Sequence, residues 1–213
     1  IADGTQTCGF AMRFNATLML VACAPLPAEE LCCFITMHAP ARVEGSHLAL
    51  DGICPTGYGA QRRTLFRLCP IPISPAFDLS EIDEAPPMER VYSILQEGFP
   101  HLMQRDLWMA NTSHMLRHSD AQLFTYRGMT TASVEFDIAN HMLVGQVATR
   151  VAARGSGYAR AFLGWLAQRL ADAGKTAVLY ALDIRVSFYE EIGFLPQETS
   201  CVLFLLDSEQ DPL

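Results

Sequence analysis

The chain has 213 residues, of which 50% are hydrophobic and 18% are charged, and its formal net charge is −8. This length suits one large domain or two small ones, and the composition excludes a disordered or collagen-like chain. The acidic balance excludes the general basic face of a nucleic-acid-binding protein. No apolar run approaches the roughly 20 residues of a membrane-spanning helix. We therefore expect a soluble globular protein with neither a nucleic-acid nor a membrane partner.

The cysteines indicate a reducing compartment. Because the chain has seven of them, at least one cannot form an intrachain disulfide, and no C-x-x-C pair gives the spacing of a zinc ribbon or a thioredoxin-type site. We expect mostly reduced, buried cysteines in a cytoplasmic protein. Ile1–Phe10 has neither the basic start nor the apolar core of a secretion signal, which agrees with that location.

Residues 1–78 are predicted to form an α/β segment that carries no chemical motif. Pro27, followed by Glu29 and Glu30 in the next turn, is typical of a helix N-terminus. In chain order the expected elements are a strand, a helix and two further strands: Ala16–Cys23, Pro27–His38, Val43–Leu50 and Thr64–Cys69.

Residues 79–87 are predicted to be a linker. The stretch Asp78–Pro87 is acidic and ends in two prolines, and both features are typical of a solvated connection. We therefore expect residues 88–213 to form the second domain.

The second domain is expected to combine a mixed sheet with helices, which is the α/β (α+β) fold class. The alternation of apolar and polar residues along Thr130–Ile138 predicts a half-exposed antiparallel strand, and Gly174 predicts the end of a long helix. The expected helices are Met88–Gln96, Ser156–Ala173 and Ile184–Ile192. The expected strands are Gln122–Arg127, Thr130–Ile138, Met142–Thr149, Thr176–Leu182 and Phe194–Leu206.

A glycine-rich turn lies between the strand Met142–Thr149 and the long helix, in the run Arg154-Gly-Ser-Gly-Tyr-Ala159. Two glycines at a helix start let the backbone approach a ligand, and the helix N-terminus attracts anions. With Arg150, Arg154 and Arg160 added, the turn suits a pyrophosphate; the alternative is an ordinary helix entrance. The run is neither a Walker A loop nor the three-glycine dinucleotide fingerprint.

Two motifs resemble those of the GNAT-type N-acetyltransferase superfamily, and the chain is most similar in type to its bacterial members. Arg154–Ala159 fits the family's Arg/Gln-x-x-Gly-x-Gly/Ala signature, and Phe188–Phe194 resembles its Phe/Leu-Tyr-Glu-x-x-Gly-Phe run. The resemblance covers Pro86–Leu206 and implies a mixed, largely antiparallel GNAT-like sheet with flanking helices, preceded by the smaller α/β segment. That first segment is either a degenerate copy of the same sheet, a lid or a dimer surface.

The resemblance also implies acetyl-CoA as cosubstrate, no metal, and roles for particular residues. Val147, Ala148 and Thr149 would pair with the pantetheine arm by strand addition and hold the thioester carbonyl. Tyr189 would protonate the departing thiolate, a role that suits a phenol because it is neutral at pH 7. The residues that would wrap the pyrophosphate are Arg154, Gly155, Ser156, Gly157, Tyr158 and Ala159.

The sequence departs from the family pattern at two positions. Val151 stands where the family often has Pro. Asp183 is the nearest equivalent of an Asn that contacts the cofactor in the family, so it either binds the cofactor or caps the helix that begins at Ile184.

The general base and the acceptor pocket are predicted less directly. Glu135 on the alternating strand is the first candidate for the base, with His114 or His118 as alternatives; each could instead be a solvated surface residue or a helix cap. By their place in the family pattern, the residues expected to line the acceptor pocket are Trp108, Asn111, His114, Arg117 and His118.

Taken together, the motifs and their resemblance to the family imply an acetyl-CoA-dependent N-acetyltransferase in which a primary amine attacks the thioester directly in a ternary complex. The amine would belong to a small molecule or a peptide, and a homodimer is open. The alternative is a non-catalytic acyl-CoA-binding sensor or scaffold with the same fold. A second enzymatic alternative uses a longer acyl donor.

Overall fold

The computed structural model describes residues 1–3, 6–14, 16–74, 77–99, 102–118 and 121–206, which form two compact units. Unit 1 comprises Ile1–Leu65, Ala181–Val186 and the described part of Gln197–Leu213; unit 2 comprises Phe66–Tyr180 and Ser187–Pro196. The units interleave in the sequence. The bounds of the two compact units therefore differ from those of the predicted segments 1–78 and 88–213. That these segments are independent domains stays a prediction.

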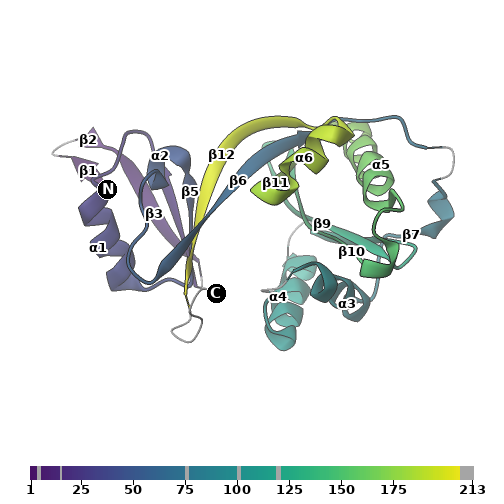
Figure 1. Cartoon of the computed structure of the whole chain (residues 1–213), viewed down its shortest axis with the longest axis horizontal. Coiled ribbons are helices and arrows are strands. Elements are labelled where there is room, and N and C mark those ends of the chain that lie inside the picture. The colour runs from purple at the N-terminus through teal and green to yellow at the C-terminus, as the bar shows by residue number, and fades with distance from the viewer. Residues whose placement is uncertain (4–5, 15, 75–76, 100–101, 119–120, 207–213) are drawn as a thin grey trace. The chain divides into compact units, whose positions relative to one another are not determined.

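Unit 1 is a sheet with two helices (Figure 1). Its strands are β1 (Ala2–Asp3), β2 (Gln6–Thr7), β3 (Gly9–Phe14), β4 (Thr17–Ala22), β5 (Arg42–Ser46), β6 (Tyr58–Leu68) and β12 (Leu195–Leu205), and its helices are α1 (Ala28–His38) and α2 (His47–Leu50). The hydrogen-bonded order is β3-β4-β5-β12-β6, and β1 pairs with β2 apart from it. The β4–β5 pair is parallel, whereas β3–β4 and β5–β12 are antiparallel.

The core of unit 1 lies between this sheet and α1. Leu31 and Ile35, one helical turn apart on α1, are buried with Leu18 and Leu20, which point to one face of β4 because they alternate along it. Tyr58 closes the core and donates a 2.8 Å hydrogen bond from Oη to the carbonyl oxygen of Pro40.

Unit 2 carries the motifs singled out in the sequence. Its elements are η1 (Leu79–Glu81), β7 (Ile82–Asp83), α3 (Met88–Gly98), α4 (Arg105–His118), β8 (Gln122–Tyr126), β9 (Thr130–Ile138), β10 (His141–Thr149), η2 (Val151–Ala153), α5 (Tyr158–Asp172), β11 (Thr176–Leu182) and α6 (Asp183–Ile192). The strand order is β6-β11-β10-β9-β8-β7. The β10–β11 pair is parallel, whereas β7–β8, β8–β9 and β9–β10 are antiparallel.

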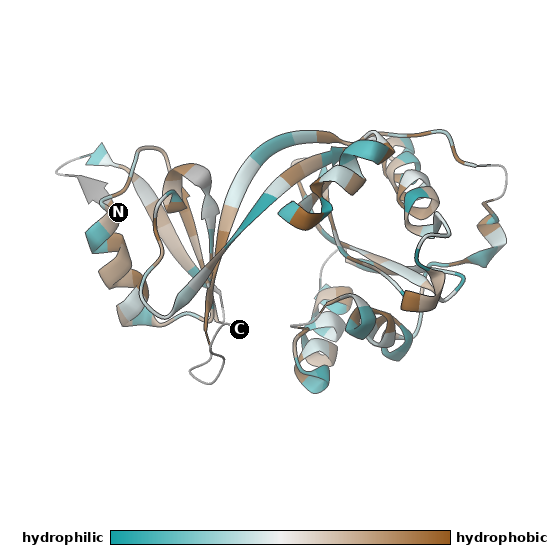
Figure 2. Cartoon of the chain, viewed as in Figure 1, coloured by the Kyte–Doolittle hydropathy of each residue, from teal (hydrophilic) through white to brown (hydrophobic). Residues whose placement is uncertain are grey.

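Helices cover both faces of β9 and β10, with α5 on one face and α3 and α4 on the other (Figure 1). Hydrophobic and hydrophilic residues follow one another along α3 and α5, as in helices with one buried face (Figure 2). Phe162, Leu163 and Leu166 of α5 have no exposed surface. Gly174, with φ of 71°, ends the helix in the left-handed conformation that glycine adopts without strain.

The fold class predicted from the sequence is confirmed, and most predicted elements are present. The strands β1, β2 and β3 were not predicted, and three further differences follow. The predicted strand Val43–Leu50 divides into β5 and the short α2, because Leu50 folds back over Gly45, where any added Cβ would lie 3.0 Å from its Cγ. The polar stretch Trp108–His118 belongs to helix α4, which buries only Trp108 and Thr112 and so has little hydrophobic periodicity. The predicted linker contains η1 and β7, which pairs with β8.

Two further features concern the helices and the cysteines. None of the helices in the described ranges has the length and hydropathy needed to cross a membrane. All seven cysteines lie in the described ranges, and none of them forms a disulfide; only Cys8 is buried, so the expectation of mostly buried cysteines is wrong.

The core of unit 2 gives the first prediction. Replacing Leu163 by Ala should lower the free energy of unfolding by about 2–5 kcal/mol, because the change removes buried methyl groups and leaves a cavity. Leu107→Ala on α4 is the matched control: its side chain is 54% exposed, so the expected change is within about 0.5 kcal/mol. Urea unfolding measures both; equal losses would contradict the burial described for α5.

Candidate functional site

Strands β10 and β11 separate partway along their length. They pair in parallel only where His141–Leu143 lies beside Thr176–Val178, although β10 continues to Thr149. Beyond Leu143, the backbone N–H and C=O groups of β10 that point toward β11 therefore lack strand partners there. Buried backbone groups are nearly always paired, so this edge can accept another extended chain.

A β-bulge lies in the same half of β10. Gly145 is opposite Ser133 on β9, and Ala148 is opposite Thr131, so the segment between them holds one residue more on β10 than on β9. Gln146 has φ of 51°, a left-handed conformation that is costly for a residue other than glycine. Strained residues and bulges cluster at functional sites, so the bulge marks this part of β10 as a candidate site.

Glu135 lies over the bulge. Its Oε1 accepts hydrogen bonds from Ser133 Oγ at 3.0 Å and from Gln146 Nε2 at 3.3 Å. A Cβ added to Gly145 would lie 2.3 Å from the same oxygen, so a larger residue here would displace the Glu135 carboxylate. In the described part of the chain, the buried Oε1 of Gln146 has no hydrogen-bond partner. The structure thus places the predicted base beside the bulge. The bulge itself was not predicted, although a glycine inside a strand is a sequence signal for one.

The glycine-rich turn opens α5. Gly155 and Gly157 have φ of 78° and 75°, and a Cβ added to either would meet no atom within 4 Å. Gly157 is the N-cap of α5 and its carbonyl accepts from Ala161 N–H, the first bond of the helix. The preceding N–H groups, from Gly157 to Arg160, have no partner within the helix. The turn thus presents backbone donors to open space.

The arginines of this region contact the protein itself. Arg154 donates from Nε to the carbonyl of Thr149 at 3.2 Å and from Nη2 to the carbonyl of Glu97. Arg150 donates to the Glu97 carboxylate at 2.5 Å and to Ser93 Oγ at 2.5 Å. Arg160 donates to the Glu191 carbonyl at 3.4 Å. The three arginines predicted to bind a pyrophosphate at the turn thus all donate hydrogen bonds to other groups of the protein.

Glu97, near the end of α3, binds the segment that precedes the glycine-rich turn. This residue was not identified from the sequence. Its Oε2 accepts a 2.7 Å hydrogen bond from Val151 N–H, in addition to the contact of its Oε1 with Arg150. The hydrogen bond from Val151 and then that from Arg150 hold the pKa of Glu97 below its ordinary value. The adjacent Gly98 lets α3 approach β10, since an added Cβ would lie 2.7 Å from Ala148 Cβ.

Tyr189 is buried on α6, with 7% of its surface exposed. Its ring lies among aromatic side chains, with centroids 5.2 Å from Phe188, 5.6 Å from Phe66 and 6.3 Å from Phe194. Asp183 is the first residue of α6, one position before the predicted start. The structure leaves the predicted roles of Tyr189 and Asp183 as predictions.

The predicted acceptor-pocket residues all lie on α4. Trp108 is buried and packs on Tyr92, with ring centroids 5.4 Å apart. The rings of His114 and His118 are 4.6 Å apart on an exposed part of the helix. The exposed Asn111 contacts Met103, and Arg117 donates to the Ser113 carbonyl.

The Glu97 contacts predict a pH-dependent stability difference. With the pKa lowered in the folded state, Glu97 stabilises the protein above its pKa in the unfolded chain, and this contribution is lost as the pH falls through the lower folded value. Glu97→Gln should therefore lower the Tm at pH 7, and the gap from wild type should narrow below the ordinary Glu pKa of 4.5. The control is Glu190→Gln on the exposed side of α6. A gap of equal size at pH 7 and pH 3 would contradict the role of the carboxylate.

Comparison with known proteins shows likeness in structure only. No protein-family model and no curated protein matches the sequence. A GCN5-related N-acetyltransferase from Sphaerobacter thermophilus is 16% identical, with a TM-score of 0.60 over 92% of this chain and 75% of that one. A GCN5-related N-acetyltransferase from Kribbella flavida is also 16% identical, with a TM-score of 0.56 over 90% and 82%.

A functionally unknown conserved protein from Staphylococcus epidermidis ATCC 12228 is 12% identical, with a TM-score of 0.62 over 90% of this chain and 85% of that one. The TM-scores establish a shared fold, whereas identities this low leave the reaction open. The chain has a GNAT-like fold.

Proposed function

We propose that the protein is an acetyl-CoA-dependent N-acetyltransferase that acts on a primary amine in a ternary complex. The observation that carries this proposal is the unpaired, bulged half of β10, which leads directly into the glycine-rich turn at the start of α5. An extended pantetheine arm and a diphosphate need such features in this order. The GNAT-like fold supports the same function.

The acyl end of the donor would bind along β10. The pantetheine amides would add to the free edge of β10 as a further strand does. Backbone N–H groups of Val147–Thr149 would donate to the thioester oxygen, and these bonds strengthen as negative charge develops on it. The bulge supports this assignment because it turns Gln146 and Val147 out of the ladder with β9.

The diphosphate would bind at the start of α5. Backbone donors from Gly155 to Ala159 and the positive end of the helix dipole both favour an anion there. The open space beside Gly155 and Gly157 supports a close approach of the ligand.

The chemistry is a single displacement with two proton transfers. The amine nitrogen forms a bond to the acetyl carbonyl carbon, and the bond from that carbon to sulfur breaks. Glu135, directly or through water, would take a proton from the amine, and Tyr189 would give its phenolic proton to the leaving thiolate. No step requires a metal.

A non-catalytic acyl-CoA-binding module is the second candidate. Ser133 and Gln146 both donate to the same oxygen of Glu135, so this oxygen is engaged in contacts within the protein. Tyr189 is surrounded by aromatic rings. Acetyl-CoA binding without CoA release against any amine would favour this module.

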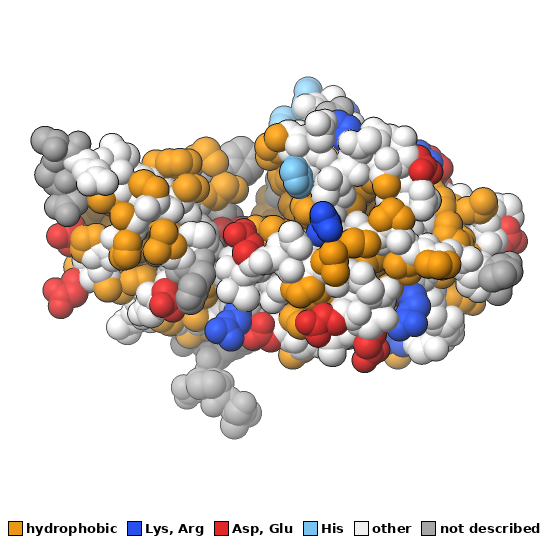
Figure 3. All heavy atoms as spheres, turned by 90° about the horizontal axis from the view of Figure 1, so that it is seen from above, with side chains coloured by type: hydrophobic (Ala, Val, Ile, Leu, Met, Phe, Trp, Pro, Cys, Tyr) orange, Lys and Arg blue, Asp and Glu red, His pale blue; other side chains and the backbone are white. Residues whose placement is uncertain are grey.

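We further propose a small-molecule or peptide amine as the acceptor and a cytoplasmic location. On the face seen in Figure 3, the described Lys and Arg side chains are scattered among acidic ones and form no continuous patch. This distribution supports a partner other than nucleic acid.

The diphosphate site predicts different effects for two substitutions of nearly equal size. Asn and Asp both tolerate the positive φ of Gly157 and both cap helices well, but only Asp adds negative charge. Gly157→Asp should weaken acetyl-CoA binding at least about 10-fold more than Gly157→Asn, because like charges repel. Isothermal titration calorimetry measures both; equal affinities of the two variants would refute the diphosphate site.

The proton transfer from Tyr189 predicts a selective loss of turnover. Tyr189→Phe should lower kcat about 100-fold with nearly unchanged acetyl-CoA affinity, because the ring remains. Tyr92→Phe is the matched control, since Tyr92 is equally buried at 7% and donates to the Met103 carbonyl. CoA release with a panel of small and peptide amines is the assay, and a wild-type rate for Tyr189→Phe would remove this residue from the mechanism.

A further inference from the structure

Arg127 occupies a strained position in the turn between β8 and β9. Its φ is 54°, and Gly128 follows with φ of 60°. A left-handed conformation is uncommon for Arg, and such residues persist only where the surrounding structure holds them. The position would suit Asn or Gly better, so the turn alone does not explain an arginine here.

Aromatic contacts hold the Arg127 side chain against the start of α5. Its guanidinium carbon lies 5.6 Å from the ring centroids of both Tyr126 and Tyr158. Its Nη1 is 3.4 Å from Tyr158 Oη, and this hydrogen bond is the first of the contacts that raise the pKa of Arg127. Tyr158 is the first residue of α5, within the glycine-rich motif. The guanidinium is therefore fixed beside the motif.

Two neighbouring arginines form ion pairs with carboxylates, whereas the exposed Arg127 forms none with the residues that the structure describes. Arg90 pairs with Asp83 at 3.4 Å, and Arg150 pairs with Glu97 at 2.5 Å. In the described part of the chain, no carboxylate oxygen forms an ion pair with Arg127 within 4 Å; the acidic groups near it are Asp78 and Glu81.

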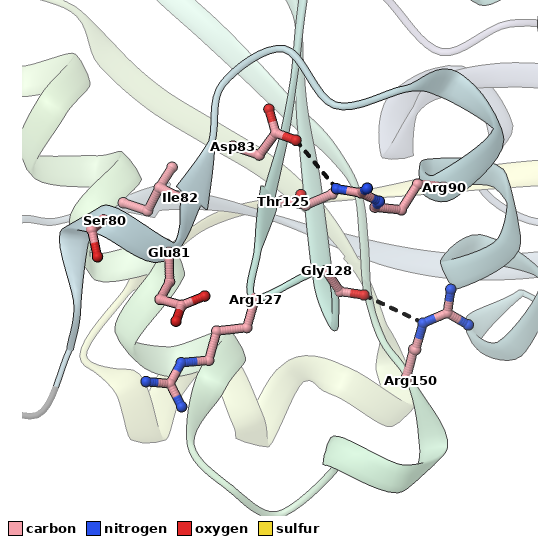
Figure 4. A pocket seen from close by; sticks show the side chains of 9 residues that line it. All are labelled: Ser80, Glu81, Ile82, Asp83, Arg90, Thr125, Arg127, Gly128 and Arg150. Atoms are coloured by element: carbon pink, nitrogen blue, oxygen red, sulfur yellow. Dashed lines mark hydrogen bonds and ion pairs between the residues drawn. The ribbon is translucent and has the colours of Figure 1, made fainter.

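All three arginines line a polar cavity of about 460 Å³. Figure 4 shows the Arg127 side chain pointing away from those of Arg90 and Arg150. Thr125, another lining residue, has no exposed surface, and its buried Oγ1 has no hydrogen-bond partner among the described residues. The cavity, which Glu81 and Asp83 also line, therefore carries at its edge an arginine without an ion-pair partner among the described residues, and a buried Thr125 hydroxyl without a hydrogen-bond partner there.

We propose that Arg127 binds the diphosphate of the acyl-CoA donor and supplies the positive charge that Arg150 and Arg154 do not supply. This inference rests on the proposed function. A guanidinium is planar and presents paired N–H donors, which match two phosphate oxygens. Stacking on Tyr126 and Tyr158 fixes its orientation before the ligand arrives, so little side-chain entropy is lost on binding.

The test compares two variants of Arg127 with a control from the same cavity. Arg127→Asn and Arg127→Gly both suit the left-handed turn, and Gly removes the backbone strain, so folding should be retained. Arg90→Gln removes the same charge from an arginine that a carboxylate neutralises. Isothermal titration calorimetry of the full chain with acetyl-CoA gives the dissociation constants, and circular dichroism melts verify the fold.

We expect both Arg127 variants to bind acetyl-CoA about 10-fold more weakly or worse, as loss of one charge-assisted hydrogen bond implies, and Arg90→Gln to stay within about twofold of wild type. The same loss is expected with acetyl-3′-dephospho-CoA, which keeps the diphosphate.

Three results would overturn the inference while the proposed function stands. These are wild-type affinity in the Arg127 variants, an equal loss for Arg90→Gln, or a loss that disappears with the 3′-dephospho donor. If the wild type binds no acetyl-CoA, the proposed function fails, and the inference fails with it.

Discussion

The backbone of β10 beyond Leu143 is the constraint on which the candidate site depends. This strand leaves β11 after three paired residues and is bulged against β9, so its amide groups need partners that the sheet does not supply. Leaving buried backbone groups unpaired is costly. An extended ligand with amides of its own would satisfy them, and the left-handed conformation of Gln146 lies within the same segment.

Contacts from α3 keep this open edge in place. Glu97 accepts from Val151 N–H and binds Arg150, while its carbonyl accepts from Arg154, and Gly98 packs closely on Ala148. Arg150 and Arg154, near the glycine-rich turn, therefore connect this region to α3. In this acidic chain, the proposed anion site consists of backbone donors and, by our inference, of Arg127.

The sequence predicts the local parts of this arrangement well. Gly155 and Gly157 predict a turn because glycine suits positive φ. The apolar spacing along α5 predicts a helix, and the alternation along β9 predicts a strand. Contacts between distant segments leave no such pattern. Glu97 and Arg150 are 53 positions apart, and nothing in either neighbourhood shows that they meet. From the sequence, the arginines near the turn are therefore predicted to belong to a ligand site, and Arg127 is predicted only as the last residue of the strand Gln122–Arg127.

Hydrogen–deuterium exchange of the backbone amides, with and without acetyl-CoA, tests the central claim most directly. The account predicts that acetyl-CoA slows exchange in two separate segments: the bulged half of β10, residues 144–149, and the turn and first helical residues, 155–160. Exchange in β3 and β4 of unit 1 should stay unchanged. Protection absent from both segments, in a protein saturated with acetyl-CoA, would contradict the account.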